Sequence, residues 1–69
     1  MSVARITEIS ATSEKSFEDA VQKGIERAAA TVRQIRSAWI KEQEVQVEGN
    51  RIKVYKVVMK VTFVLEDTL

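Results

Sequence analysis

The chain has 69 residues and a mass of 7.8 kDa, which allows one domain over residues 1–69 and no more. Eleven basic and ten acidic residues give a net charge of +1, so the basic excess typical of a nucleic-acid-binding protein is absent. The sequence has no Cys and no His, the commonest catalytic and soft metal-binding residues, so we expect neither a metal site nor an enzyme.

The first predicted element is a strand from Val3 to Ser10, where the sequence is rich in β-branched residues. A helix is predicted within TSEKSFEDAVQKGIERAAATVRQIR, residues 12–36, because apolar or small side chains recur there at spacings of three and four. Ser16 and Asp19 resemble a capping box with a shortened acid, and Ser13 is an alternative start. The predicted buried face of this helix consists of Phe17, Ala20, Val21, Gly24, Ile25, Ala28, Val32 and Ile35.

Gly24 lies in the middle of that face, between Ala20 and Ala28. A glycine inside a helix costs about 1 kcal/mol relative to alanine, so its presence needs a reason. One interpretation is that another backbone, most simply that of the sheet, approaches the helix here. The other is that the glycine is merely tolerated.

The second predicted strand is SAWIKEQEVQV, residues 37–47, in which Lys41 and Gln43 interrupt the alternation and indicate a bulge or an exposed stretch. Gly49 and Asn50 tolerate positive φ and predict a two-residue hairpin turn. The third strand runs from Ile52 to Leu65, far beyond the usual length of about 5–6 residues, with apolar residues on both faces.

The hairpin makes the second and third strands neighbours, and the longest strand is expected in the centre of the sheet. The first strand then lies on its other side, parallel to the second and joined to it by a right-handed helical crossover. The sequence therefore predicts an α+β fold of order β-α-β-β, a three-stranded antiparallel sheet with one helix packed on one face. The opposite face has no second layer, so we expect other copies of the chain to cover it.

Self-association is also expected from size. A domain of about 60 residues buries only about 60% of its unfolded surface, and no disulfide can compensate. No apolar run approaches the ~20 residues of a membrane span, and the N-terminal sequence MSVARITEIS lacks the apolar stretch of a signal peptide. We therefore expect a cytoplasmic homo-oligomer without membrane or nucleic-acid partners.

Three segments, ATSEKSFEDAVQKGIERA, IRSAWIKEQEVQV and VYKVVMKVTFVLED, together resemble the dodecins. The most specific parts are T-S-x-x-S-[FW] at Thr12–Phe17 and Y-x-V-x-[ML]-x-V-x-F-x-[LM] from Tyr55 to Leu65. The resemblance extends from about Val3 to Asp67. It implies a hollow homododecamer of β-α-β-β subunits that stores or quenches flavins such as riboflavin or FMN.

In flavin-binding dodecins a Trp on the second strand stacks on the isoalloxazine ring. A Gln immediately after the Tyr of the third strand forms hydrogen bonds with the polar edge of that ring. The matching positions here are Ser37 and Lys56, and the only Trp of the chain, Trp39, follows two residues later. Such a shift keeps the face of the strand but moves the side chain by about 6.6 Å. The resemblance therefore implies a remodelled flavin pocket at Ser37, Trp39 and Lys56, with weaker flavin binding than in dodecins that keep both residues. We expect either no flavin binding or, because a phosphate could contact Lys56 or Lys60, a preference for phosphorylated ligands over riboflavin.

Two interpretations remain for each candidate. Trp39 either packs in a subunit interface or stacks on a ligand. Lys56 and Lys60 share one strand face and either belong to a solvated surface balanced by Glu42 and Glu44 or contact an anion. Two functions follow, a shell that binds flavin or another flat or anionic small molecule, and a structural assembly that binds ions or another small ligand.

Overall fold

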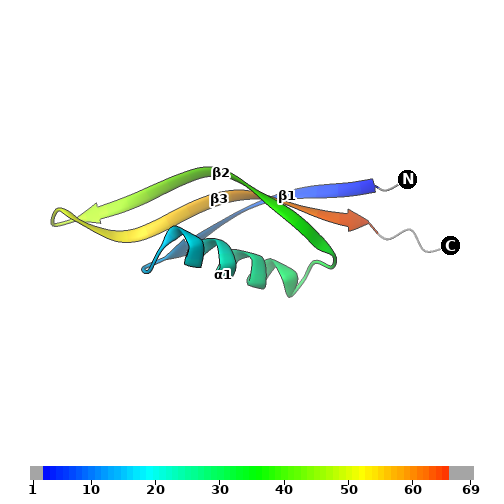
Figure 1. Cartoon of the computed structure of the whole chain (residues 1–69), viewed down its shortest axis with the longest axis horizontal. Coiled ribbons are helices and arrows are strands. Elements are labelled where there is room, and N and C mark those ends of the chain that lie inside the picture. Colours follow the sequence, from blue (N-terminus) through cyan, green and yellow to red (C-terminus); the bar gives the residue numbers. More distant parts are fainter. Residues whose placement is uncertain (1–2, 66–69) are drawn as a thin grey trace.

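A computed structural model describes residues 3–65 and shows the predicted order of elements (Figure 1). Strand β1 spans Val3–Ser13, helix α1 Phe17–Ala29, strand β2 Ile35–Glu48 and strand β3 Arg51–Leu65. The strand order is β1-β3-β2, and β3 pairs antiparallel with both neighbours. The predicted central position of the third strand is confirmed. Positions 1, 2 and 66–69 of the predicted domain lie outside the described residues.

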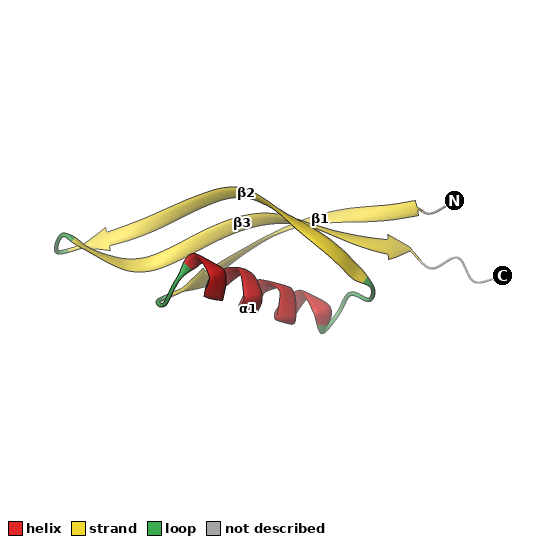
Figure 2. Cartoon of the chain, in the orientation of Figure 1, coloured by secondary structure: helices red, strands yellow, loops and turns green. Residues whose placement is uncertain are grey.

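Helix α1 packs on one face of the sheet, as Figure 2 shows. Val57, Met59 and Val61 of β3 are buried beneath it together with Ala20 of the helix. These three strand residues alternate along β3, so the side chains between them point to the other face. Met59 is fully buried, whereas Phe63, on the same face of β3, is only partly buried. Residues packed around the core are Ile9, Ala11, Phe17, Val21, Ile25, Ile35, Ala38 and Ile40.

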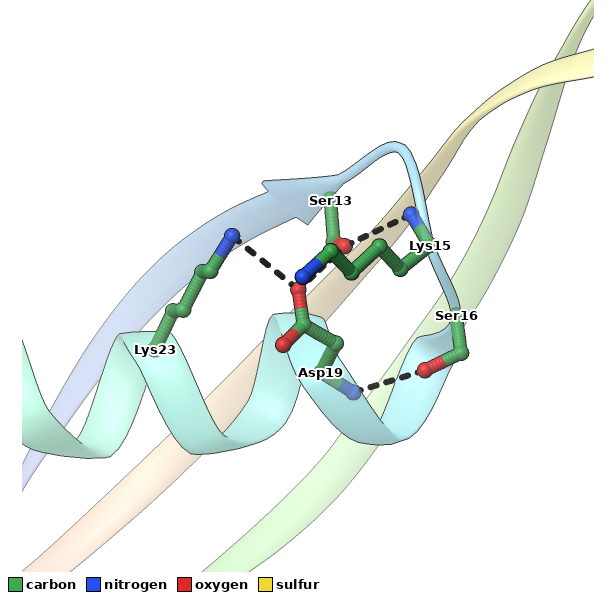
Figure 3. Close-up of polar contacts among 5 residues, drawn as sticks. All are labelled: Ser13, Lys15, Ser16, Asp19 and Lys23. Carbon is green, nitrogen blue, oxygen red and sulfur yellow. Dashed lines mark hydrogen bonds and ion pairs between the residues drawn. The ribbon is translucent and has the colours of Figure 1, made fainter.

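A small polar network holds the junction between β1 and α1 (Figure 3). Ser16 is the N-cap, and its hydroxyl accepts a hydrogen bond from the backbone N–H of Asp19 at 2.9 Å. In a capping box the Asp19 carboxylate would accept a hydrogen bond from the backbone N–H of Ser16. Here it instead accepts a hydrogen bond from the hydroxyl of buried Ser13 at 2.5 Å. The hydrogen bond from Ser13, and then the one from Lys23, lower the pKa of Asp19.

The helix ends earlier than predicted. It stops at Ala29, and Val32 and Ile35, which continue the helical spacing in the sequence, lie in the connection and at the start of β2. Gln34 adopts a positive φ of 58°, which ends any helical path. Ile35 then pairs with Phe63 across the sheet. Pairing with β3 therefore overrides the helical periodicity of this segment.

Gly24 is buried in α1, but its neighbours are side chains and not a backbone. A Cβ placed on Gly24 would lie 2.5 Å from Met59 Cε, 3.1 Å from Ala11 Cβ and 3.7 Å from Ile9 Cδ1. The expectation that a backbone approaches here is wrong. The glycine instead makes room for side chains of β1 and β3 beneath the helix.

Strands β2 and β3 are joined by the predicted turn, in which Gly49 and Asn50 have positive φ values of 59° and 64°. The pairing of β2 with β3 shifts register between Ile40 and Glu42, so Lys41 forms an irregularity at the middle of the strand, as predicted. Two further shifts occur near the ends of β2, between residues 35 and 37 and between residues 46 and 47. These shifts set which β2 side chains share a face with each residue of β3.

Candidate functional site

The sheet face opposite α1, here called the open face, has no covering layer within the described part of the chain (Figures 1 and 2). Cross-strand partners in an antiparallel sheet point to the same side, so the register assigns residues to this face. It carries apolar, hydroxyl and charged side chains from all three strands. They include Ile6, Glu8, Ser10 and Thr12 of β1, Lys56, Val58, Lys60 and Thr62 of β3, and Ser37, Trp39, Glu42 and Glu44 of β2.

All three predicted cofactor-binding residues lie on the open face. Ser37 pairs with Thr62, Trp39 with Lys60, and Lys56 with Glu44. Ser37 and Trp39 are therefore close together, whereas Lys56 lies four residues along β3 from Lys60, a separation of about 13 Å. The register thus brings Trp39 next to Lys60 and places Lys56 at a separate position on the same face.

Trp39 and Lys60 form a cation–π contact on the open face. The indole is 67% exposed, and the Lys60 ammonium lies 5.5 Å from its ring centroid. A cation over an exposed indole face contributes about 0.5–1 kcal/mol. The contact was missed in the sequence because it depends on the register shift within β2, although both residues were identified individually.

Lys56 lies in a different charge environment. Its ammonium is 3.9 Å from the carboxylate of Glu44, which agrees with the predicted balance of lysines by acidic residues. Together with Glu42, Gln43 and Val58, the pair lines a shallow pocket of about 270 Å³. This volume is slightly below the 300–1,000 Å³ typical of small-molecule sites, so the pocket by itself does not hold a drug-sized ring.

Among residues 3–65, no group of three or more Asp, Glu, His or Cys side chains lies close enough together to hold a metal ion. Within the same range, no helix is both long and apolar enough to span a membrane. The chemistry available on the open face is therefore aromatic stacking, hydrogen bonding by hydroxyls, and charge from lysine and glutamate.

Comparison with known proteins identifies the family of this fold. The Dodecin family model matches residues 3–66. The structure of a dodecin from Streptomyces davaonensis shares 30% identity, with a TM-score of 0.90 and coverage of 96% of this chain and 97% of that one. An arginine-to-alanine variant of the Thermus thermophilus dodecin shares 34% identity, with a TM-score of 0.92 and coverage of 99% and 100%.

A third similar structure is that of the calcium dodecin from Mycobacterium tuberculosis, which has a novel calcium-binding site. It shares 28% identity, with a TM-score of 0.80 and coverage of 97% and 96%. The comparison with curated protein sequences gave no match.

The family match covers almost the whole chain, and the β-α-β-β fold with one helix on a three-stranded antiparallel sheet agrees with it. Dodecins form homododecamers, bind small ligands including flavins, and are not enzymes. The chain is therefore a member of the dodecin family.

Proposed function

We propose that this protein is a cytoplasmic homododecameric shell that binds a planar small molecule of the flavin type on the open face beside Trp39. The observation that carries the proposal is the indole ring, which is 67% exposed on a sheet face that no layer formed by residues 3–65 covers. An exposed indole offers the stacking surface that a flat ring system needs. The flavin class comes from the family, whose members bind flavins.

The proposed affinity for flavin is lower than that of dodecins with a Trp at the position of Ser37 and a Gln at the position of Lys56. Serine offers almost none of the aromatic area that makes stacking worth about 1–3 kcal/mol for a nucleobase. Lysine has only donors, so it leaves donors on the edge of the isoalloxazine ring without a partner, at a cost of about 1–3 kcal/mol when buried. Trp39, two residues from Ser37 on the same face, offsets part of this loss. The net expectation is an affinity reduced about a hundredfold.

Titration of riboflavin into the assembled protein, followed by quenching of flavin fluorescence, tests this proposal. The wild type should quench riboflavin at micromolar concentrations, and Trp39→Phe should weaken binding several-fold because phenyl has less stacking area. Tyr55→Phe is the matched control, because Tyr55 packs edge-on against Phe17 on the helix side of the sheet. Nanomolar quenching by the wild type would contradict the predicted loss, and equal binding by Trp39→Phe would contradict the location.

The second candidate function is a structural dodecin-like assembly that binds ions or another small ligand instead of flavin. What favours it is the similarity to the calcium dodecin from Mycobacterium tuberculosis. Glu42 and Glu44 of the shallow pocket are only two carboxylates, and residues 3–65 hold no larger group of ligands, so a second subunit would have to supply the remaining ligands of an ion bound there. Calorimetric titration with calcium would support this candidate if binding is saturable and Glu42→Gln weakens it. Glu18→Gln, which alters an exposed carboxylate on α1, is the matched control.

A further inference from the structure

Unlike the other two lysines of the open face, Lys60 has no carboxylate partner among residues 3–65. Lys41 lies 3.4 Å from the carboxylate of Glu8, and Lys56 lies 3.9 Å from that of Glu44. Glu8 is also the cross-strand partner of Lys60, but it is engaged by Lys41. Within residues 3–65, Lys60 forms no ion pair, and its ammonium is held over the Trp39 ring. Its charge is therefore available to a ligand.

The position of Lys60 means that any ring stacked on this face of Trp39 must displace the ammonium. A neutral ring takes the indole surface and leaves Lys60 with neither its aromatic contact nor a counter-ion. A ring with an anionic group takes the same surface but gives the ammonium a charge-assisted hydrogen bond in exchange, which is stronger than a neutral one. The exchange therefore favours anionic ligands.

We propose that Lys60 makes this site selective for planar ring systems that carry a phosphate or carboxylate, over neutral rings of the same shape. The inference rests on the proposed binding at Trp39 and names the class of ligand that the site prefers. It assigns a specificity-determining role to Lys60, which is not one of the three predicted cofactor-binding residues Ser37, Trp39 and Lys56.

The surroundings of the Trp39–Lys60 pair also give the anionic group a direction. On one side lie Ser37 and Thr62, which are cross-strand partners and each carry a hydroxyl that can donate to an anion. On the other side lie Glu42 and Lys41, and the Lys41 ammonium is already paired with the carboxylate of Glu8 at 3.4 Å, so the net charge on this side is negative and repels an anion. The anionic tail of a bound ligand therefore extends from Lys60 toward Ser37 and Thr62.

The test compares riboflavin with FMN, which share the ring system and differ by one phosphate. Dissociation constants are measured by flavin quenching for the wild type, Lys60→Met and Lys53→Met. Lys53→Met is the control. Lys53 is exposed and paired with Glu48 near the hairpin turn, so its substitution removes the same charge from the subunit at a distant place. Circular dichroism and light scattering confirm that each variant is folded and assembled.

The wild type and Lys53→Met should bind FMN about tenfold more tightly than riboflavin, which corresponds to about 1.4 kcal/mol. In Lys60→Met the two ligands should bind about equally, and Ser37→Ala should lower the ratio of the riboflavin dissociation constant to the FMN dissociation constant. The preference in the wild type should also fall as salt is added, because screening weakens exposed charge contacts.

An unchanged preference for FMN in Lys60→Met would overturn the role of Lys60. Equal binding of riboflavin and FMN by the wild type, weakened for both by Trp39→Phe, would overturn the anion selectivity and leave the binding site at Trp39 intact. Binding that Trp39→Phe leaves unaffected, or no binding of either flavin, would overturn the proposed function together with this inference.

Discussion

Replacement of Gly24 tests how α1 packs on the sheet. A Cβ at this position would lie 2.5 Å from Met59 Cε and 3.1 Å from Ala11 Cβ. The Met59 methyl is the end of a flexible side chain and can move, whereas Ala11 Cβ is fixed to the backbone of β1. Gly24→Leu therefore forces the helix away from β1 and separates the side chains that form the core.

The magnitude follows from two opposing effects. Overpacking a core costs about 1–3 kcal/mol, and we expect about 3 kcal/mol because the leucine enters a space that is too small even for one methyl group. The better helix propensity of leucine returns about 0.8 kcal/mol. The free energy of unfolding should therefore fall by about 2 kcal/mol. In a domain of this size, each kcal/mol corresponds to about 4–8 °C in Tm.

Thermal unfolding followed by far-UV circular dichroism measures this loss. All variants are compared at one protomer concentration, because assembly makes the Tm depend on concentration. Gln22→Leu is the matched control, since Gln22 is exposed on the same helix, where its amide donates to Glu26. A Gly24→Leu variant as stable as the wild type would show that Gly24 does not face the sheet.

Two other predictions concern pH and assembly. Because the pKa of Asp19 is lowered in the folded state, chiefly by Ser13, its contribution to stability is complete above its unfolded pKa of about 3.9 and is lost as the pH falls through the folded value. Acid unfolding should therefore depend less steeply on pH below about pH 4 in Asp19→Asn than in the wild type, and parallel curves would contradict this. Static light scattering should give a mass near twelve times 7.8 kDa, and a monomer or dimer at micromolar concentration would contradict the dodecamer.

Most of the fold was predictable because its signals are local. Gly49 and Asn50 mark the hairpin, and the length of the third strand places it centrally, which the structure confirms. The end of α1 was not predictable from periodicity, because Val32 and Ile35 keep the helical spacing after the helix has stopped. What decides the boundary is the pairing of Ile35 with Phe63, a contact between residues far apart in the sequence.

The candidate site was predictable only in part. Strand alternation indicated that Ser37 and Trp39 share a face, and the register agrees. The contact of Trp39 with Lys60 needs the register between two strands, and the shift at Lys41 changes that register in the middle of β2. Alternation within one strand cannot reveal such a pairing, because it gives the face of each side chain but not its neighbour across the sheet.

The central position of β3 determines the order in which the sheet can form. Within the described residues β1 and β2 do not pair with each other and are linked only by the side chains of Glu8 and Lys41, so neither has a strand neighbour until β3 is present. The β2–β3 hairpin closes through a short turn and can form early, whereas the pairing of Val3 with Leu65 closes a loop of nearly the whole chain. Such long-range pairing is slow relative to local contacts. During synthesis on the ribosome, β1 and α1 therefore emerge before β3, the strand that pairs with β1 and supplies the buried core residues Val57, Met59 and Val61, and the complete sheet forms only after β3 has been made.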